Sequence, residues 1–430
     1  MSSSLYGATA TQAPPVRPTG QQLATMAPPA RPAGPDSPQQ GMSTPRLLVA
    51  LRTVSVVLCL LFTGLSLLGT LVPSYQLSYA VGDVSQGQRL REARTQLAQA
   101  DQIAADAFLA ETPPPAELRD FQRVMDSVST SLILAASYNE TDAPRLSQVQ
   151  ERVNAYRRQV DAAVTTSGKD PAAGAKEFAQ TSTTLEEPMQ ILAELASKTD
   201  ATATSRFSLT FGTMAVVTGW VSVAVLLLAS VQTARRTHRV LNPGLAIAMA
   251  LLLAATLTLT SHQGTTRDTL SSAEQTTIIS AHSAGDARTA ALRAKAAESR
   301  AYLVPDGGYD RLWSQHNQEV TAALARLRPG SLQTTPASQW ATYKSAHTGV
   351  SSRDARALGR STGQGGTLGP MKAFVETVST LERAQTAAAT DEINNARRPG
   401  TGVMIVCLLC GLGAVGTAAW GLSRRLAEFR

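Results

Sequence analysis

The chain has 430 residues, a formal net charge of +7 and a pI near 9.5, with 17% charged and 5% aromatic residues. A basic pI can indicate nucleic-acid binding, but no segment combines a basic block with interleaved aromatic residues, so we expect no nucleic-acid partner. Only three cysteines are present, so the fold cannot depend on a disulfide framework and must be stabilised by packing.

Residues 1–45 are rich in Pro, Ser, Thr, Gln and Gly, which predicts a disordered tail. The motif Ala-Pro-Pro-X-Arg-Pro-X-Gly occurs twice in this tail. Its prolines favour polyproline II, a conformation that aromatic grooves of partner proteins recognise. The motif is either a docking site or part of a solvated tether. Its defining residues are Pro14, Pro15, Arg17, Pro18, Pro28, Pro29, Arg31 and Pro32.

Four stretches are apolar and uncharged for long enough to cross a bilayer as helices, which takes about 20 residues. We assign these spans to residues 53–72, 207–232, 240–261 and 401–422. The lipid bilayer is therefore the first partner of the chain, which we expect to be a multi-pass protein of the plasma membrane.

Basic residues predict the orientation of the spans. The short turn at 233–239 carries three arginines, and positive residues in short loops favour the cytoplasmic side. The tail at 423–430 is also basic, so we expect both termini in the cytoplasm. The basic residues that determine this topology are Arg46, Arg52, Arg235, Arg236, Arg239, Arg424 and Arg425.

The segment 73–206 then lies outside the cytoplasm, and its apolar residues recur at spacings of three and four. Two of these stripes are Leu118, Phe121, Met125, Val128, Leu132 and Ala135, and Leu146, Val149, Val153, Tyr156, Val160 and Ala163. Narrow stripes of this kind predict a bundle of four helices. We expect its first and last helices to continue into the adjoining spans as rigid rods.

The segment 262–399 repeats this plan. Its stripes are Trp313, Val320, Leu324 and Leu327, then Trp340, Tyr343, His347 and Val350, then Met371, Phe374, Val378 and Leu381. Ala107-Phe108-Leu109 matches Ala301-Tyr302-Leu303, and Tyr156 matches Tyr343, which indicates an internal duplication. The predicted fold is all-α, with four transmembrane helices and two tandem extracytoplasmic four-helix bundles.

No set of residues indicates an enzyme, and we expect no catalytic residue, cofactor or metal. His282, His316 and His347 could form a metal site only by meeting from three helices, and buried, hydrogen-bonded histidines are the commoner explanation. Cys407 and Cys410 form a C-x-x-C pair, but inside a span they are small apolar residues on one helix face. The spans lack charge and central proline, which argues against a transporter.

The four-span layout, the repeated Ala-Phe/Tyr-Leu and Tyr positions and the Ala- and Arg-rich composition resemble the GlnX-type membrane proteins of actinobacteria. The resemblance covers about residues 46–425. It implies a non-enzymatic relay that transmits the availability of aspartate and glutamate. The input in that family is an extracellular solute-binding lipoprotein, and the output is a soluble cytoplasmic serine/threonine kinase. The family has no signature that assigns ligand-binding residues here.

Two other functions remain open on the sequence. The outer segments also resemble the four-helix sensor domains of bacterial chemoreceptors and histidine kinases, which would make the chain a direct sensor of a small molecule. A scaffold protein of the cell envelope is the third reading. The ligand, the identity of the partners, the direction of the signal and the formation of a homodimer are left open.

Overall fold

The computed structural model describes residues 44–110, 112–206, 210–237, 242–305, 308–350, 355–363, 365–397 and 400–427. Residues 45–430 form one unit by their contacts. Both copies of the proline-rich motif, and Arg239, lie outside the described residues, as do the side chains of Arg236 and Arg425.

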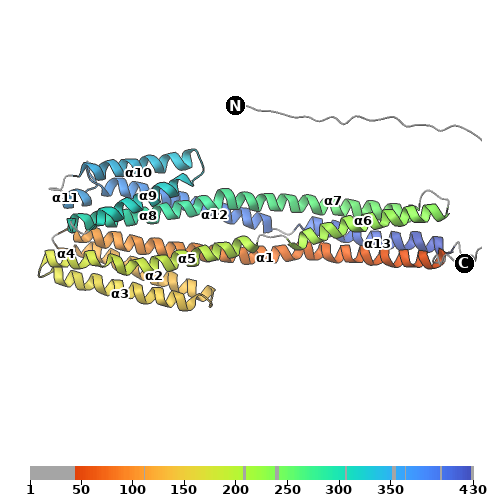
Figure 1. Cartoon of the computed structure of the whole chain (residues 1–430), viewed down its shortest axis with the longest axis horizontal. Coiled ribbons are helices and arrows are strands. Elements are labelled where there is room, and N and C mark those ends of the chain that lie inside the picture. The colour runs from red at the N-terminus through yellow and green to blue at the C-terminus, as the bar shows by residue number, and fades with distance from the viewer. Residues whose placement is uncertain are drawn as a thin grey trace, which may run out of the picture. The chain divides into compact units, whose positions relative to one another are not determined.

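Helices account for nearly all of the described residues, and no strand occurs among them (Figure 1). The helices of the first half are α1 (Thr44–Phe108), α2 (Pro115–Tyr138), α3 (Ala143–Ser167), α4 (Pro171–Gln180), α5 (Ser182–Arg206) and α6 (Thr210–Thr237). Those of the second half are α7 (Pro243–Ser272), the π-helix η1 (Ala273–Ile278), α8 (Ile279–Leu303), α9 (Tyr309–Ala325), α10 (Ser331–Gly349), α11 (Ala355–Arg360), α12 (Leu368–Arg397) and α13 (Thr401–Ala427).

Four helical runs within the described residues are long and apolar enough to cross a membrane. They are Val49–Val72, Thr213–Arg235, Pro243–Leu303 and Leu368–Arg424. The last two runs far exceed the length that a bilayer requires, so only their apolar parts, in α7 and α13, qualify as spans. The four apolar runs lie together at one end of the molecule (Figure 1), which we call the apolar end. Their length and composition indicate a membrane protein. The outward-facing side chains of this end include Leu60, Leu61, Leu228 and Leu409, which are about half or more exposed, as on a surface that contacts lipid.

The spans pack closely at glycines, because a residue without a side chain lets two backbones approach each other. At the start of α7, Gly244 lies so near α13 that a Cβ atom built on it would be 2.5 Å from the Cα of Gly421 and 2.6 Å from the carbonyl oxygen of Thr417. Asn242 secures the same crossing, because its Nδ2 donates to the carbonyl oxygen of Gly421 at 3.2 Å. Small residues therefore fix how α7 and α13 meet.

At the opposite, polar end, the predicted apolar stripes are buried. Phe121, Met125, Val128, Leu132 and Ala135 line the buried face of α2. The stripe of α3 is buried throughout, from Leu146 to Ala163. The residue spacing predicted these faces correctly. A helix packed against a core buries one face, and the residues of that face recur every three or four positions.

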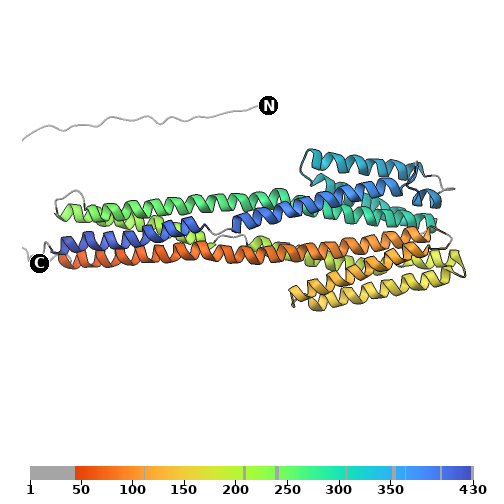
Figure 2. The ribbon, with the colours of Figure 1, turned by 180° about the vertical axis from the view of Figure 1, so that it is seen from behind.

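The polar end contains two helical groups that share one core. The first helical group is the polar part of α1 with α2, α3, α4 and α5, and the second is α8, α9, α10, α11 and α12. They meet where α1 and α8 lie side by side (Figure 2). Both faces are rich in buried alanine, including Ala93, Ala100 and Ala104 on α1 and Ala287 and Ala294 on α8, which lets the two backbones approach closely. The sequence predicted two tandem bundles but did not indicate that they share a core.

The same two helices connect the ends of the molecule. The predicted rod is confirmed for α1, which runs unbroken from Thr44 to Phe108. In the second half, α7, η1 and α8 form one continuous run from Pro243 to Leu303. The junctions between α5 and α6 and between α12 and α13 include residues outside the described part of the chain, so the same prediction for α5 stays a prediction. Two continuous rods thus link the apolar end to the shared core.

We predict that Gly244→Ala destabilises the protein by about 1–3 kcal/mol, because the added methyl group would overlap the α13 backbone. Thermal unfolding of the detergent-solubilised protein would measure the change. Gly416→Ala is the matched control, since that glycine is exposed on α13 with nothing within 4 Å of its added Cβ. The control should be neutral or gain up to about 1 kcal/mol of helix propensity. Equal effects of the two substitutions would contradict the close crossing.

Candidate functional site

The contact between α1 and α8 follows the internal duplication. Glu92-Ala93-Arg94-Thr95 on α1 corresponds to Asp286-Ala287-Arg288-Thr289 on α8, at the 194-residue spacing that also separates the two Ala-Phe/Tyr-Leu matches. The hydroxyls of Thr95 and Thr289 hydrogen-bond to each other at 2.8 Å. Farther along both helices, Ser299 donates to Asp106 at 2.6 Å, so α1 and α8 run parallel with equivalent residues side by side.

Two ion pairs flank the contact between Thr95 and Thr289 and are copies of each other. Arg94 Nη1 lies 3.3 Å from Asp286 Oδ1, and Arg288 Nη1 lies 3.4 Å from Glu92 Oε2. At the 194-residue spacing, Arg94 corresponds to Arg288 and Glu92 corresponds to Asp286. Each half therefore contributes one acidic residue and one arginine. Arg288 also contacts Glu382 of α12 at 3.2 Å.

Farther from the apolar end, Asp101 and Arg300 form a buried ion pair. The guanidinium donates two hydrogen bonds to the carboxylate, at 2.8 and 2.5 Å. Tyr156 of α3 donates its hydroxyl to the same carboxylate at 2.7 Å, and the ring of Phe178 lies 4.9 Å from the guanidinium carbon. A bidentate pair with these additional partners is the arrangement in which buried charges are tolerated.

The duplicated counterpart of this pair has its signs reversed. Lys295 occupies the place equivalent to Asp101, and Asp106 the place equivalent to Arg300; the two groups lie 3.6 Å apart. Lys295 is fully buried, and its Nζ also donates to Glu298 at 2.7 Å and to the carbonyl oxygen of Gly359 at 2.9 Å. We refer to Arg94–Asp286, Arg288–Glu92, Asp101–Arg300 and Asp106–Lys295 together as the α1–α8 ion pairs.

Two of the buried groups, Glu298 and Lys295, remain charged at neutral pH. Burial alone would raise the pKa of Glu298, but Lys295 and His347 outweigh it and lower that pKa to about 2. For Lys295, burial opposes the charge, yet Asp106 and Glu298 keep its pKa above the usual value. The pKa of Asp106 is raised by burial, against the attraction of Lys295. The shared core therefore contains a buried, charged Lys295–Glu298 pair, with Asp106 next to it.

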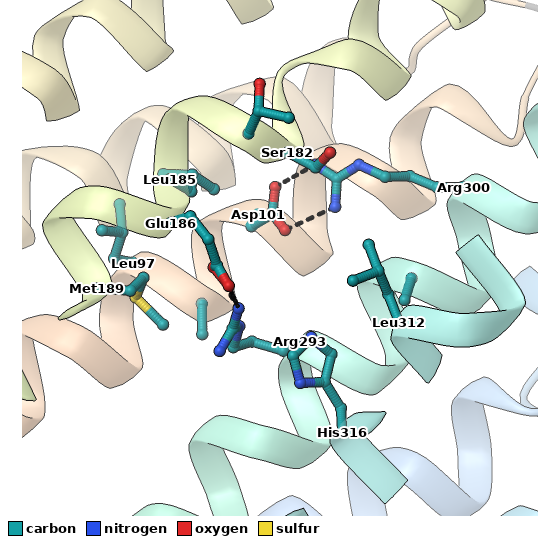
Figure 3. Close-up of a pocket in the computed structure, with 13 residues that line it drawn as sticks. Leu97, Asp101, Ser182, Leu185, Glu186, Met189, Arg293, Arg300, Leu312 and His316 are labelled. Atoms are coloured by element: carbon teal, nitrogen blue, oxygen red, sulfur yellow. Dashed lines mark hydrogen bonds and ion pairs between the residues drawn. The ribbon is translucent and has the colours of Figure 1, made fainter. Parts of the chain in front are cut away.

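A small cavity opens beside Asp101 and Arg300, between α1, α5, α8 and α9 (Figure 3). Its volume is about 140 Å³. Arg293 projects toward Glu186 of α5 in Figure 3, and the two side chains are ion-paired at 2.5 Å. His316 lines the cavity next to Arg293. The volume suits a molecule about the size of benzene, and a carboxylate ligand would have to displace Glu186 from Arg293.

The three histidines considered from the sequence each have a separate carboxylate neighbour. His282 lies 3.7 Å from Asp200, His316 lies 2.9 Å from Glu319, and His347 lies 2.7 Å from Glu298. Within the described part of the chain, no group of three metal-binding side chains comes together.

The basic residues predicted from the sequence lie at the apolar end, far from this network. Arg46, Arg52, Arg235 and Arg424 are exposed at the ends of the spans, and the guanidinium carbon of Arg424 is 5.7 Å from the ring centre of Trp420. The α1–α8 ion pairs were not predicted from the sequence. The repeated Glu/Asp-Ala-Arg-Thr stretch was a signal for two of them, because it marks equivalent charged positions in the two halves.

Comparison with known proteins supports a sensing role. Residues 79–208 match the family model of an actinobacterial sensor domain, a stretch that contains most of the first helical group. No curated protein and no solved structure matches the chain. The matched family fits the expectation of an actinobacterial sensor and indicates a function in sensing or signalling.

We predict that Asp101→Asn and Arg300→Gln each destabilise the protein by about 3–5 kcal/mol, because each leaves a buried charge without its partner. The double variant should lose clearly less than the sum, with a coupling of about 1–3 kcal/mol. Unfolding in mixed SDS micelles, followed by circular dichroism, would measure the cycle.

Asp120→Asn with Arg123→Gln is the control cycle, since that pair is 50% and 76% exposed and should contribute at most about 1 kcal/mol. If the buried variants fail to fold, Tyr156→Phe provides a milder test, with an expected loss of about 1 kcal/mol. A coupling near zero for Asp101 and Arg300 would show that the pair does not hold α1 against α8.

Proposed function

We propose that the protein is a non-enzymatic, multi-pass sensor of the plasma membrane that relays a signal from outside the cell to the cytoplasm. The observation that carries this proposal is the pair of continuous rods, α1 and α7–η1–α8, which join the apolar end to the α1–α8 ion pairs within and beside the matched sensor domain. A change of packing between the rods at the polar end would reach the apolar end without passing through a loop.

The proposed orientation places the basic turn and both termini in the cytoplasm and the two helical groups outside. Arg46, Arg52, Arg235 and Arg424 support it, because each is exposed and lies at the same end of the spans. In this orientation the shared core faces the extracytoplasmic space, and the two groups are the tandem bundles expected from the sequence.

The input and output are proposed from the resemblance to the GlnX-type proteins. An extracellular solute-binding lipoprotein would dock on the helical groups and report amino-acid availability, and a cytoplasmic serine/threonine kinase would receive the signal at the basic turn and tails. Docking would act by favouring one of two packings of α1 against α8, which requires that the partner bind the two packings with different affinity.

Direct sensing of a small molecule is the second candidate. The cavity between α1, α5, α8 and α9 favours it, because its lining contains residues of both halves and includes the Asp101–Arg300 pair. A ligand there would change the α1–α8 contact itself.

The relay is tested by crosslinking the full-length protein in its native membrane, purifying it in detergent and identifying the copurifying proteins by mass spectrometry. We expect a solute-binding lipoprotein and a serine/threonine kinase. A variant lacking residues 13–34 should keep the lipoprotein and lose kinase if the proline-rich motif is the docking site. Recovery of the protein alone, or only with copies of itself, would refute the relay and leave direct sensing.

Orientation is tested with single cysteines in a variant whose native Cys59, Cys407 and Cys410 are replaced by alanine. A membrane-impermeant maleimide should label Gly363→Cys, in the loop before α12, on intact cells. The matched position Thr237→Cys, at the basic turn, should be labelled only after lysis. The opposite pattern would invert the proposed topology.

A further inference from the structure

A second, larger cavity lies between α1, α8 and α12, on the face of the α1–α8 contact opposite α5. Its volume is about 650 Å³, within the range of small-molecule sites. Its charged lining consists of Arg89, Arg91, Arg288, Arg383, Glu92 and Glu382. We call it the arginine cavity.

The arginine cavity carries an excess of positive charge. Four arginines face two glutamates, a net charge of +2. The lining stays positive when Asp200, the ion-pair partner of Arg91, is counted with it, because the net charge is then +1. His282 adds no charge at neutral pH, since burial and the nearby arginines lower its pKa to about 3.

Two arginines of the lining, one from each half of the chain, have no carboxylate partner among the described residues. Arg89 is on α1 and Arg383 is on α12, and both are exposed. Arg383 donates from Nε to the carbonyl oxygen of Ser379 at 3.1 Å, and no carboxylate in the described part of the chain lies within ion-pair distance of either guanidinium. Arg288, by comparison, is paired with both glutamates of the lining.

Duplication does not account for the two arginines. At the 194-residue spacing, the counterpart of Arg89 is Ser283. The helix equivalent to α12 is α5, in which Leu185, Leu192 and Leu195 correspond to Met371, Val378 and Leu381 at a spacing of 186. That spacing makes Ser197 the counterpart of Arg383. The related face of the molecule therefore has serine at both equivalent positions.

The cavity lies too far from the bilayer for a lipid headgroup. Arg89 is 17 residues beyond Val72, the end of the first apolar run, which corresponds to about 26 Å along a helix. The headgroup region extends only about 5–8 Å beyond the hydrocarbon core. A ligand of the cavity must therefore come from the aqueous phase.

We propose that the arginine cavity binds a small soluble dianion, a dicarboxylate or a phosphate compound, between Arg89 and Arg383. Each acidic group would accept charge-assisted hydrogen bonds from one guanidinium, and the ligand would tie α1 of one half to α12 of the other. The assignment names a ligand class for the proposed sensor, but it is carried by the cavity alone.

Isothermal titration of the full-length protein in nanodiscs of zwitterionic lipid, at constant ionic strength, tests the proposal with succinate and inorganic phosphate as probes. We expect saturable binding of at least one of them. Arg89→Gln with Arg383→Gln should weaken it by about tenfold or more, as expected for the loss of charge-assisted hydrogen bonds. Neither arginine has an ion-pair partner among the described residues, so the double variant should retain the thermal stability of the wild type.

Arg158→Gln with Arg328→Gln is the matched control, because both arginines are exposed elsewhere and the change in net charge is the same. The control should bind like the wild type. Absence of saturable binding of both probes, or equal affinity in the two double variants, would overturn the proposal. Binding that appears only in nanodiscs containing anionic lipid would also overturn it, in favour of a headgroup. None of these measurements depends on a protein partner, so failure of the relay would appear only in the crosslinking experiment.

Discussion

The pairing of acidic with basic side chains between α1 and α8 is the constraint on which the rest of the structure depends. A buried carboxylate or ammonium is acceptable only next to its partner, so Asp101–Arg300 and Asp106–Lys295 fix the register of the two helices. A slip of one turn, about 5.4 Å, would separate both pairs together. Because α1 and α8 continue toward the apolar end as rods, the same register determines the relative positions of the two spans along their axes.

The sequence predicted the features that depend on periodicity and length. The apolar residues from Phe121 to Ala135 recur at spacings of three and four because they share one helix face. The four apolar runs can be recognised because a helix that crosses lipid needs a long apolar sequence. The fold class and the buried faces could therefore be predicted. The orientation in the membrane and the role of the proline-rich motif depend on cellular compartments and partner proteins, and helix packing carries no information about either.

The candidate site was not predictable in the same way. Asp101 and Arg300 are nearly 200 residues apart and lie in alanine-rich helices, where isolated charges usually belong to a solvated face. Only tertiary contact makes them core residues. Lys295 is the extreme case, because local sequence gives no indication that a lysine in this setting is completely buried.

The reversed signs in the duplicated contact also limit which halves can pack against each other. If two copies of the first helical group met through α1 in the same arrangement, Asp101 of one copy would face Asp106 of the other, and two copies of the second group would set Lys295 against Arg300. Either meeting would bring like charges together in a dry core. Two identical halves could therefore not pack through this surface, whereas the two different halves of the chain are complementary there. Any homodimer of the protein has to form through another surface.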